Sequence, residues 1–363
     1  MTPVSGGDAT PTGPPAIHAG RHLAGSILLL LVSMLFCAGL AELSARAFWH
    51  FRYDVPFTDP GRILYAYYPE LARIARNNPS RGDGFYNVLL LGSSTLSTDY
   101  GEVPQALRER LTSEGQRNVR VFNLAVRAQT SRDSRLAYAA VGRARFDLVV
   151  FYEGINEARA NNAPPGVFRD DYGHFSWYEI VNALAPYHGS ASVALPYTLH
   201  YVALRLRQTL MSDRYVPTEA PRKEWLQYGR DHRSAASFKQ NLEAILALAS
   251  QRGDPVLLMT FATYIPEDYS LDAFKKGQLD YDLHLIPIEL WGRREDVLET
   301  VALENEIVRN EAAQHQSVLF VDQARLMPKS GRYFNDPCHF TVAGSARFVE
   351  NLLSVLPPAI GSH

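Results

Sequence analysis

The sequence has little cysteine and almost no net charge, and each shortage excludes a class of protein. Only two cysteines, Cys37 and Cys338, occur among 363 residues, so we expect no disulfide framework. No CxxC pair or Cys/His cluster has the spacing of zinc ligands, so we expect no zinc site. The formal net charge of -2 leaves no basic footprint for nucleic acid.

An apolar segment near the N-terminus stands out from this ordinary composition. Residues 23–41 carry no charged side chain, and as a helix they would extend over roughly 28 Å, close to the thickness of a bilayer core. We predict one transmembrane helix over residues 23–45, preceded by a disordered Pro- and Gly-rich tail at 1–22. A cleaved signal peptide is the alternative, although its apolar core is usually only ~7–15 residues long.

Arginines stand on both sides of the apolar segment and leave its orientation open. Arg21 precedes the segment, whereas Arg46 and Arg52 follow it. Counting them by the positive-inside rule would place the rest of the chain in the cytoplasm. Cys37 does not resemble a lipoprotein site, because the bulky Phe36 stands where a small residue is expected.

Beyond a juxtamembrane connector at residues 46–84, short apolar runs alternate with amphipathic stretches. The runs predict strands at 87–92, 118–125, 146–154, 255–263 and 317–322, and the stretches predict helices at 103–111, 131–144, 238–249, 297–313 and 342–353. Continuous apolar strands separated by helices predict an α/β fold, with a five-stranded parallel sheet covered on both faces. Ligands of such sheets bind beyond the carboxyl ends of the strands.

Two long segments, at about 159–232 and 264–295, interrupt this alternation. Segments of this length inside a compact domain usually carry function or a small structure of their own. Within the first, residues 197–211 are apolar on one face and carry Arg205 and Arg207 on the other. This segment is either a helix packed on the domain, or a helix at the membrane surface or over the substrate.

Polar residues that could take part in catalysis stand where the predicted strands end. Ser94 lies in a Gly-Ser-Ser turn after the first strand, where a helix start favours negative charge. Asn156 follows the third strand, and its amide could bond the loop backbone or face a developing oxyanion. Asp336 and His339 share one loop before the last helix. Their spacing lets the carboxylate orient the imidazole, leaving its other nitrogen to take a serine proton.

These blocks, in this order, resemble the GDSL or SGNH hydrolase family. The resemblance implies a flavodoxin-like three-layer α/β/α sandwich, with Ser94 as nucleophile and Asp336 and His339 completing a catalytic triad. It also implies an oxyanion hole formed by the backbone amides of Ser94 and Ala128 and the side chain of Asn156.

The resemblance covers about residues 86–355 outside the two insertions and has three departures. Ser93 replaces the family's aspartate beside the nucleophile, and Glu157 replaces the last aspartate of the third block. Ala128 replaces a glycine, which keeps the amide donor but adds a methyl group that restricts the backbone. None of the three departures removes a catalytic group.

The resemblance implies a serine esterase or deacetylase that needs no metal or organic cofactor, with its catalytic domain at residues 85–358. The apolar segment would anchor it in a membrane. Its substrate would be an acyl ester, with an ester on a surface glycan as one candidate. The same triad would also serve an O-acetyltransferase acting on an extracytoplasmic glycan, and an inactive binding module would keep the same fold. On the family argument we expect a single-pass protein with its domain on the periplasmic side of the inner membrane, against the arginine count.

Overall fold

The computed structural model describes residues 17–113, 118–217 and 220–356, with side chains from Gly25 onward. Its centre is a five-stranded sheet in the order β2-β1-β3-β4-β5, with every neighbouring pair parallel. The strands are β1 (Tyr86–Gly92), β2 (Val119–Asn123), β3 (Leu148–Tyr152), β4 (Val256–Met259) and β5 (Leu319–Val321). This order is the flavodoxin-like one, so the predicted fold is confirmed.

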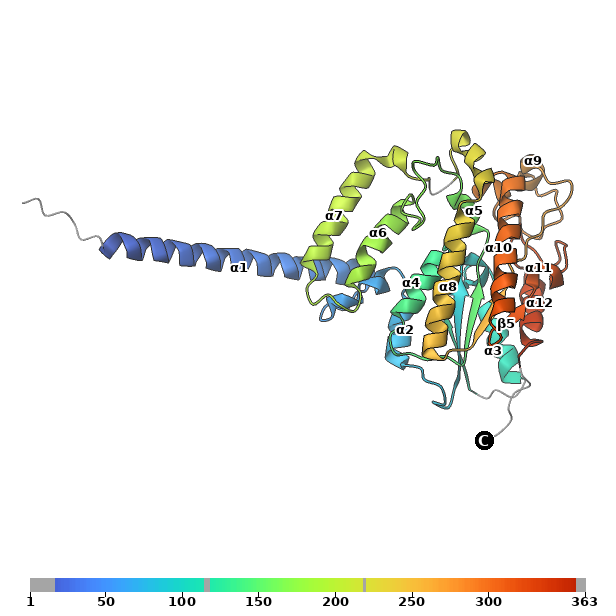
Figure 1. Cartoon of the computed structure of the whole chain (residues 1–363), viewed down its shortest axis with the longest axis horizontal. Coiled ribbons are helices and arrows are strands. Elements are labelled where there is room, and N and C mark those ends of the chain that lie inside the picture. The colour runs from blue at the N-terminus through green and yellow to red at the C-terminus, as the bar shows by residue number, and fades with distance from the viewer. Residues whose placement is uncertain (1–16, 114–117, 218–219, 357–363) are drawn as a thin grey trace, which may run out of the picture.

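Helices cover both faces of the sheet, as Figure 1 shows. One layer contains α4 (Ser131–Ala140), α8 (Ser234–Arg252) and α10 (Arg294–Gln314), and the other contains α3 (Val103–Ser113) and α12 (Val342–Leu353). Along β1, Leu89 and Leu91 pack into one core cluster while Val88 and Leu90 pack into the other. Both faces of the strand are therefore buried, which explains why its sequence is apolar without alternation.

The N-terminal helix α1 (Ile17–Tyr53) is longer than the predicted membrane segment at both ends. It begins inside the stretch expected to be disordered, of which residues 1–16 lie outside the described part. The portion from Gly25 to Tyr53 is long and apolar enough to cross a membrane. Its first half projects from the domain (Figure 1), whereas Ala45 and Trp49 are buried against the domain.

Residues 46–84, expected as a connector, are packed into the domain. They contain the end of α1, a 3-10 helix η1 (Pro60–Ala66) and α2 (Glu70–Asn77). Tyr68 is buried, and its hydroxyl donates to Asp133 Oδ1 at 2.8 Å. This segment therefore joins α1 to the sheet domain through core contacts.

The two insertions form small helical structures at the carboxyl edge and on one side of the sheet. In the first, α6 (Ser176–Leu184) and α7 (Leu195–Leu210) lie side by side where α1 leaves the domain (Figure 1). The other short elements are η2 (Ser94–Leu96), α5 (Asn156–Ala160), η3 (Ala185–Tyr187), η4 (Ser212–Arg214), η5 (Lys223–Asp231), α9 (Leu271–Lys275), η6 (Ile288–Leu290) and α11 (Gln323–Leu326).

Candidate active site

The predicted nucleophile lies in a tight turn at the carboxyl end of β1. Ser94 begins η2, and the turn closes through hydrogen bonds from the Leu96 and Ser97 amides to the Ser93 carbonyl. A Cβ on Gly92 would lie 2.8 Å from the Tyr152 carbonyl oxygen, so only glycine lets β1 end this close to β3. The local sequence thus fixes where the Ser94 hydroxyl points.

Three residues of the predicted triad form one hydrogen-bonded chain. His339 Nε2 lies 2.8 Å from Ser94 Oγ, and His339 Nδ1 lies 2.6 Å from Asp336 Oδ2. With Nδ1–H donating to the carboxylate, Nε2 is free to accept the serine proton. Asp336 and His339 have no exposed surface, and Ser94 is only 5% exposed.

The carboxylate and the imidazole are both held by further contacts. Asp336 Oδ1 accepts the backbone N–H groups of Cys338 and His339 at 2.9 Å, and Oδ2 accepts that of Ile286 at 3.1 Å. The ring of Tyr100 stacks on the ring of His339, with centroids 4.5 Å apart. The contact with Ile286 could not be predicted from the sequence, because a backbone donor can belong to any residue type.

Two residues of the predicted oxyanion hole, Ala128 and Asn156, line one cavity of about 340 Å³. The side chain of Asn156 is fixed at both ends: Oδ1 accepts from Trp291 Nε1 and Nδ2 donates to the Gln129 carbonyl, each at 2.8 Å. Since an amide nitrogen carries two hydrogens, one remains for a ligand. Trp291 comes from the second insertion and was not predicted.

Ala128 adopts the left-handed backbone conformation, with φ of 62°. A glycine would take this conformation without strain, whereas an alanine is strained in it. In the described part of the chain, the backbone N–H groups of Ala128 and Ser94 have no acceptor. No hydrogen bond joins Ser94 to Ala128 or Asn156 among the described residues, so the oxyanion hole stays a prediction.

Buried carboxyl groups behind the site were not expected from the sequence. Burial raises the pKa of Glu157 to about 8 and holds the pKa of Glu153 well above its usual range. Glu157 Oε1 accepts the backbone N–H of Ser131 at 2.8 Å, and Glu153 Oε1 accepts from Ser134 Oγ at 2.7 Å. Glu157 thus ties the start of α4 to the block that holds Asn156. The Glu157 carboxyl group therefore has a structural role.

Among the described residues, only one group has donor atoms close enough to share a metal ion. It consists of Asp336, Cys338 and His339. Their nearest donors, His339 Nδ1 and Asp336 Oδ2, already bond each other. Burial also raises the pKa of the Cys338 thiol well above its usual range, which disfavours the thiolate that a metal would need. The arrangement therefore fits a triad better than a metal site, and Cys338 is buried.

No protein-family model and no curated protein matches the chain. An acetyl xylan esterase from Geobacillus stearothermophilus is 13% identical, with a TM-score of 0.41 over 79% of this chain and 99% of that chain. A putative acylhydrolase from Bacteroides fragilis is 13% identical, with a TM-score of 0.42 over 78% of this chain and 94% of that one. These similarities do not indicate a function for this chain. Its function has to be inferred from the geometry of the site.

Proposed function

We propose that the chain is a membrane-anchored serine hydrolase that cleaves an acyl ester. The observation that carries this proposal is the unbroken chain of hydrogen bonds from Asp336 through His339 to Ser94. Ser94 and His339 lie 245 residues apart in sequence, and only the fold brings them together. A buried histidine with a carboxylate on one nitrogen and a serine hydroxyl on the other is the arrangement that activates serine.

The reaction follows from the positions of these groups. His339 Nε2 takes the Ser94 proton while Ser94 Oγ attacks the ester carbonyl, and Asp336 stabilises the imidazolium that forms. The amides of Ser94, Ala128 and Asn156 would hold the oxyanion, and losing one such donor typically costs about 3–4 kcal/mol of barrier. His339 then protonates the leaving alcohol. Water, activated by the same histidine, releases the acyl group from Ser94.

The lining of the cavity at Ala128 and Asn156 favours, as substrate, an acyl ester carried by a larger molecule such as a glycan. Phe175, Trp177 and Tyr178 line this cavity and offer flat apolar surface for a sugar ring or an acyl chain. Arg127 and Arg159 also line it, and neither has an acidic partner in the described part of the chain. Burial lowers the pKa of Arg159 to about 10, and a negative group on the substrate would offset this burial.

An O-acetyltransferase is the second candidate, favoured by the burial of Ser94 and His339. A transferase must keep water from the acyl-enzyme until its acceptor arrives, and a buried serine helps to do so. The inactive binding module is disfavoured by the intact triad geometry. We place the domain on the extracytoplasmic side, because the family resemblance implies an extracytoplasmic ester as substrate.

The full chain in detergent or nanodiscs tests these alternatives directly. We expect hydrolysis of p-nitrophenyl acetate and labelling by a fluorophosphonate probe, both lost in Ser94→Ala and His339→Ala. Ser93→Ala is the matched control, because it changes the same turn and keeps the triad. Labelling without hydrolysis, but with acetyl transfer to an added glycan, would favour the transferase. A folded wild type that neither hydrolyses nor labels would refute the serine mechanism.

A further inference from the structure

One helix of the first insertion carries an apolar face that no described residue covers. On α7, the side chains of Leu199, Val202, Leu206 and Leu210 are 62, 56, 61 and 75% exposed. Their spacing of three, four and four residues places them on one side of the helix. We name these four residues the outer stripe of α7.

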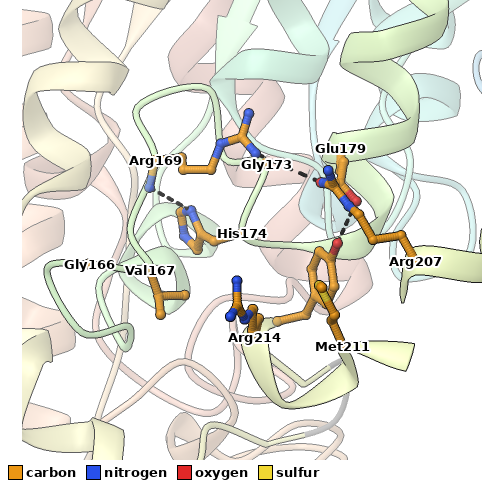
Figure 2. A pocket seen from close by; sticks show the side chains of 10 residues that line it. Gly166, Val167, Arg169, Gly173, His174, Glu179, Arg207, Met211 and Arg214 are labelled. Carbon is orange, nitrogen blue, oxygen red and sulfur yellow. Dashed lines mark hydrogen bonds and ion pairs between the residues drawn. The ribbon is translucent and has the colours of Figure 1, made fainter. Parts of the chain in front are cut away.

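The opposite side of α7 already makes the contacts that hold the helix on the domain. Tyr197, Leu204 and Gln208 are its buried residues, and Gln208 Nε2 donates to the Ser176 carbonyl at 2.8 Å. Arg207 forms an ion pair with the buried Glu179 of α6, which Figure 2 shows together with Arg169 nearby. The fold therefore does not need the outer stripe. At such a position a water-facing helix normally carries polar residues.

The N-terminal half of α7 is bonded directly to α1. Glu42 accepts the backbone N–H groups of Ala194 and Leu195, both at 2.8 Å, and so caps the start of α7 with a carboxylate. Further along, Trp49 Nε1 donates to Thr198 Oγ1 at 2.8 Å. Beyond Glu42 toward the N-terminus, α1 exposes apolar side chains on all sides. In Figure 1, α7 lies on the side of the domain from which this exposed part projects.

Basic side chains border the outer stripe. His200 and Arg207 lie between the stripe and the buried face on one side, and Arg205 lies on the other, as the 100° step of a helix places them. All three are exposed; Arg205 has no acidic partner in the described part of the chain, whereas Arg207 is paired with Glu179. An apolar stripe with basic borders is the pattern of a helix lying in a membrane interface, where long cationic side chains reach the lipid phosphates.

We infer that α7 is a second membrane contact, with its outer stripe in the interface of the same bilayer that α1 crosses. The inference rests on the proposed anchoring through α1. It goes beyond the proposed function, because it fixes how the domain sits on the lipid surface. Lipid is the occupant that the surroundings favour, because the start of α7 is hydrogen-bonded to Glu42, next to the exposed apolar part of α1.

Site-directed spin labelling of the full chain in phosphatidylcholine/phosphatidylglycerol nanodiscs tests this inference. In a Cys37→Ser background, single cysteines replace Leu199, Val202, Leu206 or Leu210, with Lys239→Cys on the exposed side of α8 as the control. Cys338 is fully buried and would not label in the folded protein. We expect labels on the stripe to collide several-fold more with oxygen than with a water-soluble nickel complex, and the control to show the reverse.

A label on the native Cys37 reports on α1 separately. If the stripe favours nickel while Cys37 favours oxygen, the anchor stands and the inference about α7 is refuted. If Cys37 also favours nickel, the anchoring proposal fails, and the inference fails with it. Labels on the stripe that are shielded from both reagents would show a protein occupant, such as a second copy of the chain, and would also overturn the inference.

Discussion

The hydrogen bond from Trp291 to Asn156 offers a demanding test of the proposed site. Trp291 Nε1 donates to Asn156 Oδ1 at 2.8 Å, and both residues are buried. Replacing Trp291 by Phe keeps an aromatic ring but removes the donor. A buried acceptor left without its partner typically costs about 1–3 kcal/mol of stability, so we expect a lower Tm in a protein that still folds.

The effect on catalysis has an upper limit that the structure defines. If Asn156 holds the oxyanion as proposed and Trp291 acts by orienting its amide, loss of Trp291 should not cost more than loss of that amide. Removing an oxyanion donor lowers kcat by roughly 10²–10³-fold. We therefore expect Asn156→Ala to show a fall of that size in p-nitrophenyl acetate hydrolysis. Trp291→Phe should show a smaller fall in kcat with KM little changed, because ground-state contacts remain.

A double-mutant cycle separates this positioning role from a merely structural one. If Trp291 acts through Asn156, then Trp291→Phe should have almost no further effect on kcat in the Asn156→Ala background. A fall in that background as large as in wild type would refute the reasoning. It would mean that the tryptophan supports the site by packing alone.

Four further predictions concern other parts of the site. Ala128→Gly should relieve the left-handed backbone at φ 62°, worth roughly 1–2 kcal/mol, and raise Tm without loss of activity; a lower Tm would contradict this. Asp336→Asn should lower kcat by about 10⁴-fold while circular dichroism stays native, and a loss below tenfold would argue against the triad. Unfolding free energy should fall as pH rises from 4.5 to about 8, because unfolded Glu157 loses its proton while the folded, buried carboxyl keeps it. Glu157→Gln should flatten that part of the denaturation profile, and an unchanged slope would show that other groups cause it. Arg159→Gln should reduce kcat/KM for acetyl esters that carry a negative charge and leave neutral esters unaffected; equal loss for both would indicate a general packing defect.

Much of the fold could be predicted because its causes are local. Apolar runs such as that of β1 identify buried parallel strands, and the polar blocks after them identify the functional edge of the sheet. Ser94, Asp336 and His339 could be selected because their chemistry shows in the sequence, and the structure joins them as a hydrogen-bonded chain.

The remaining contacts depend on tertiary packing that no local pattern records. Trp291 and Asn156 are hydrogen-bonded although they lie 135 residues apart in sequence. Ile286 contributes only its backbone amide to Asp336. Residues 46–84 were expected to form a connector, yet Tyr68 and Ile74 are buried in the core. For residues 197–211 the sequence left a packed helix or a membrane-surface helix open. The structure explains why both interpretations were open: α7 buries Tyr197 and Leu204 on one face and exposes the outer stripe on the opposite face.

The continuity of α1 with the domain limits where the enzyme could act. The helix runs unbroken to Tyr53, and Glu42, Trp49 and Tyr53 are each hydrogen-bonded to α7 or the residue before it. A domain on a flexible linker would search a volume above the membrane. On the proposed anchoring through α1, this domain has no such linker, and its search would be reduced to diffusion in the membrane plane and rotation about the membrane normal. Its substrates would have to present their esters at one fixed height above the lipid.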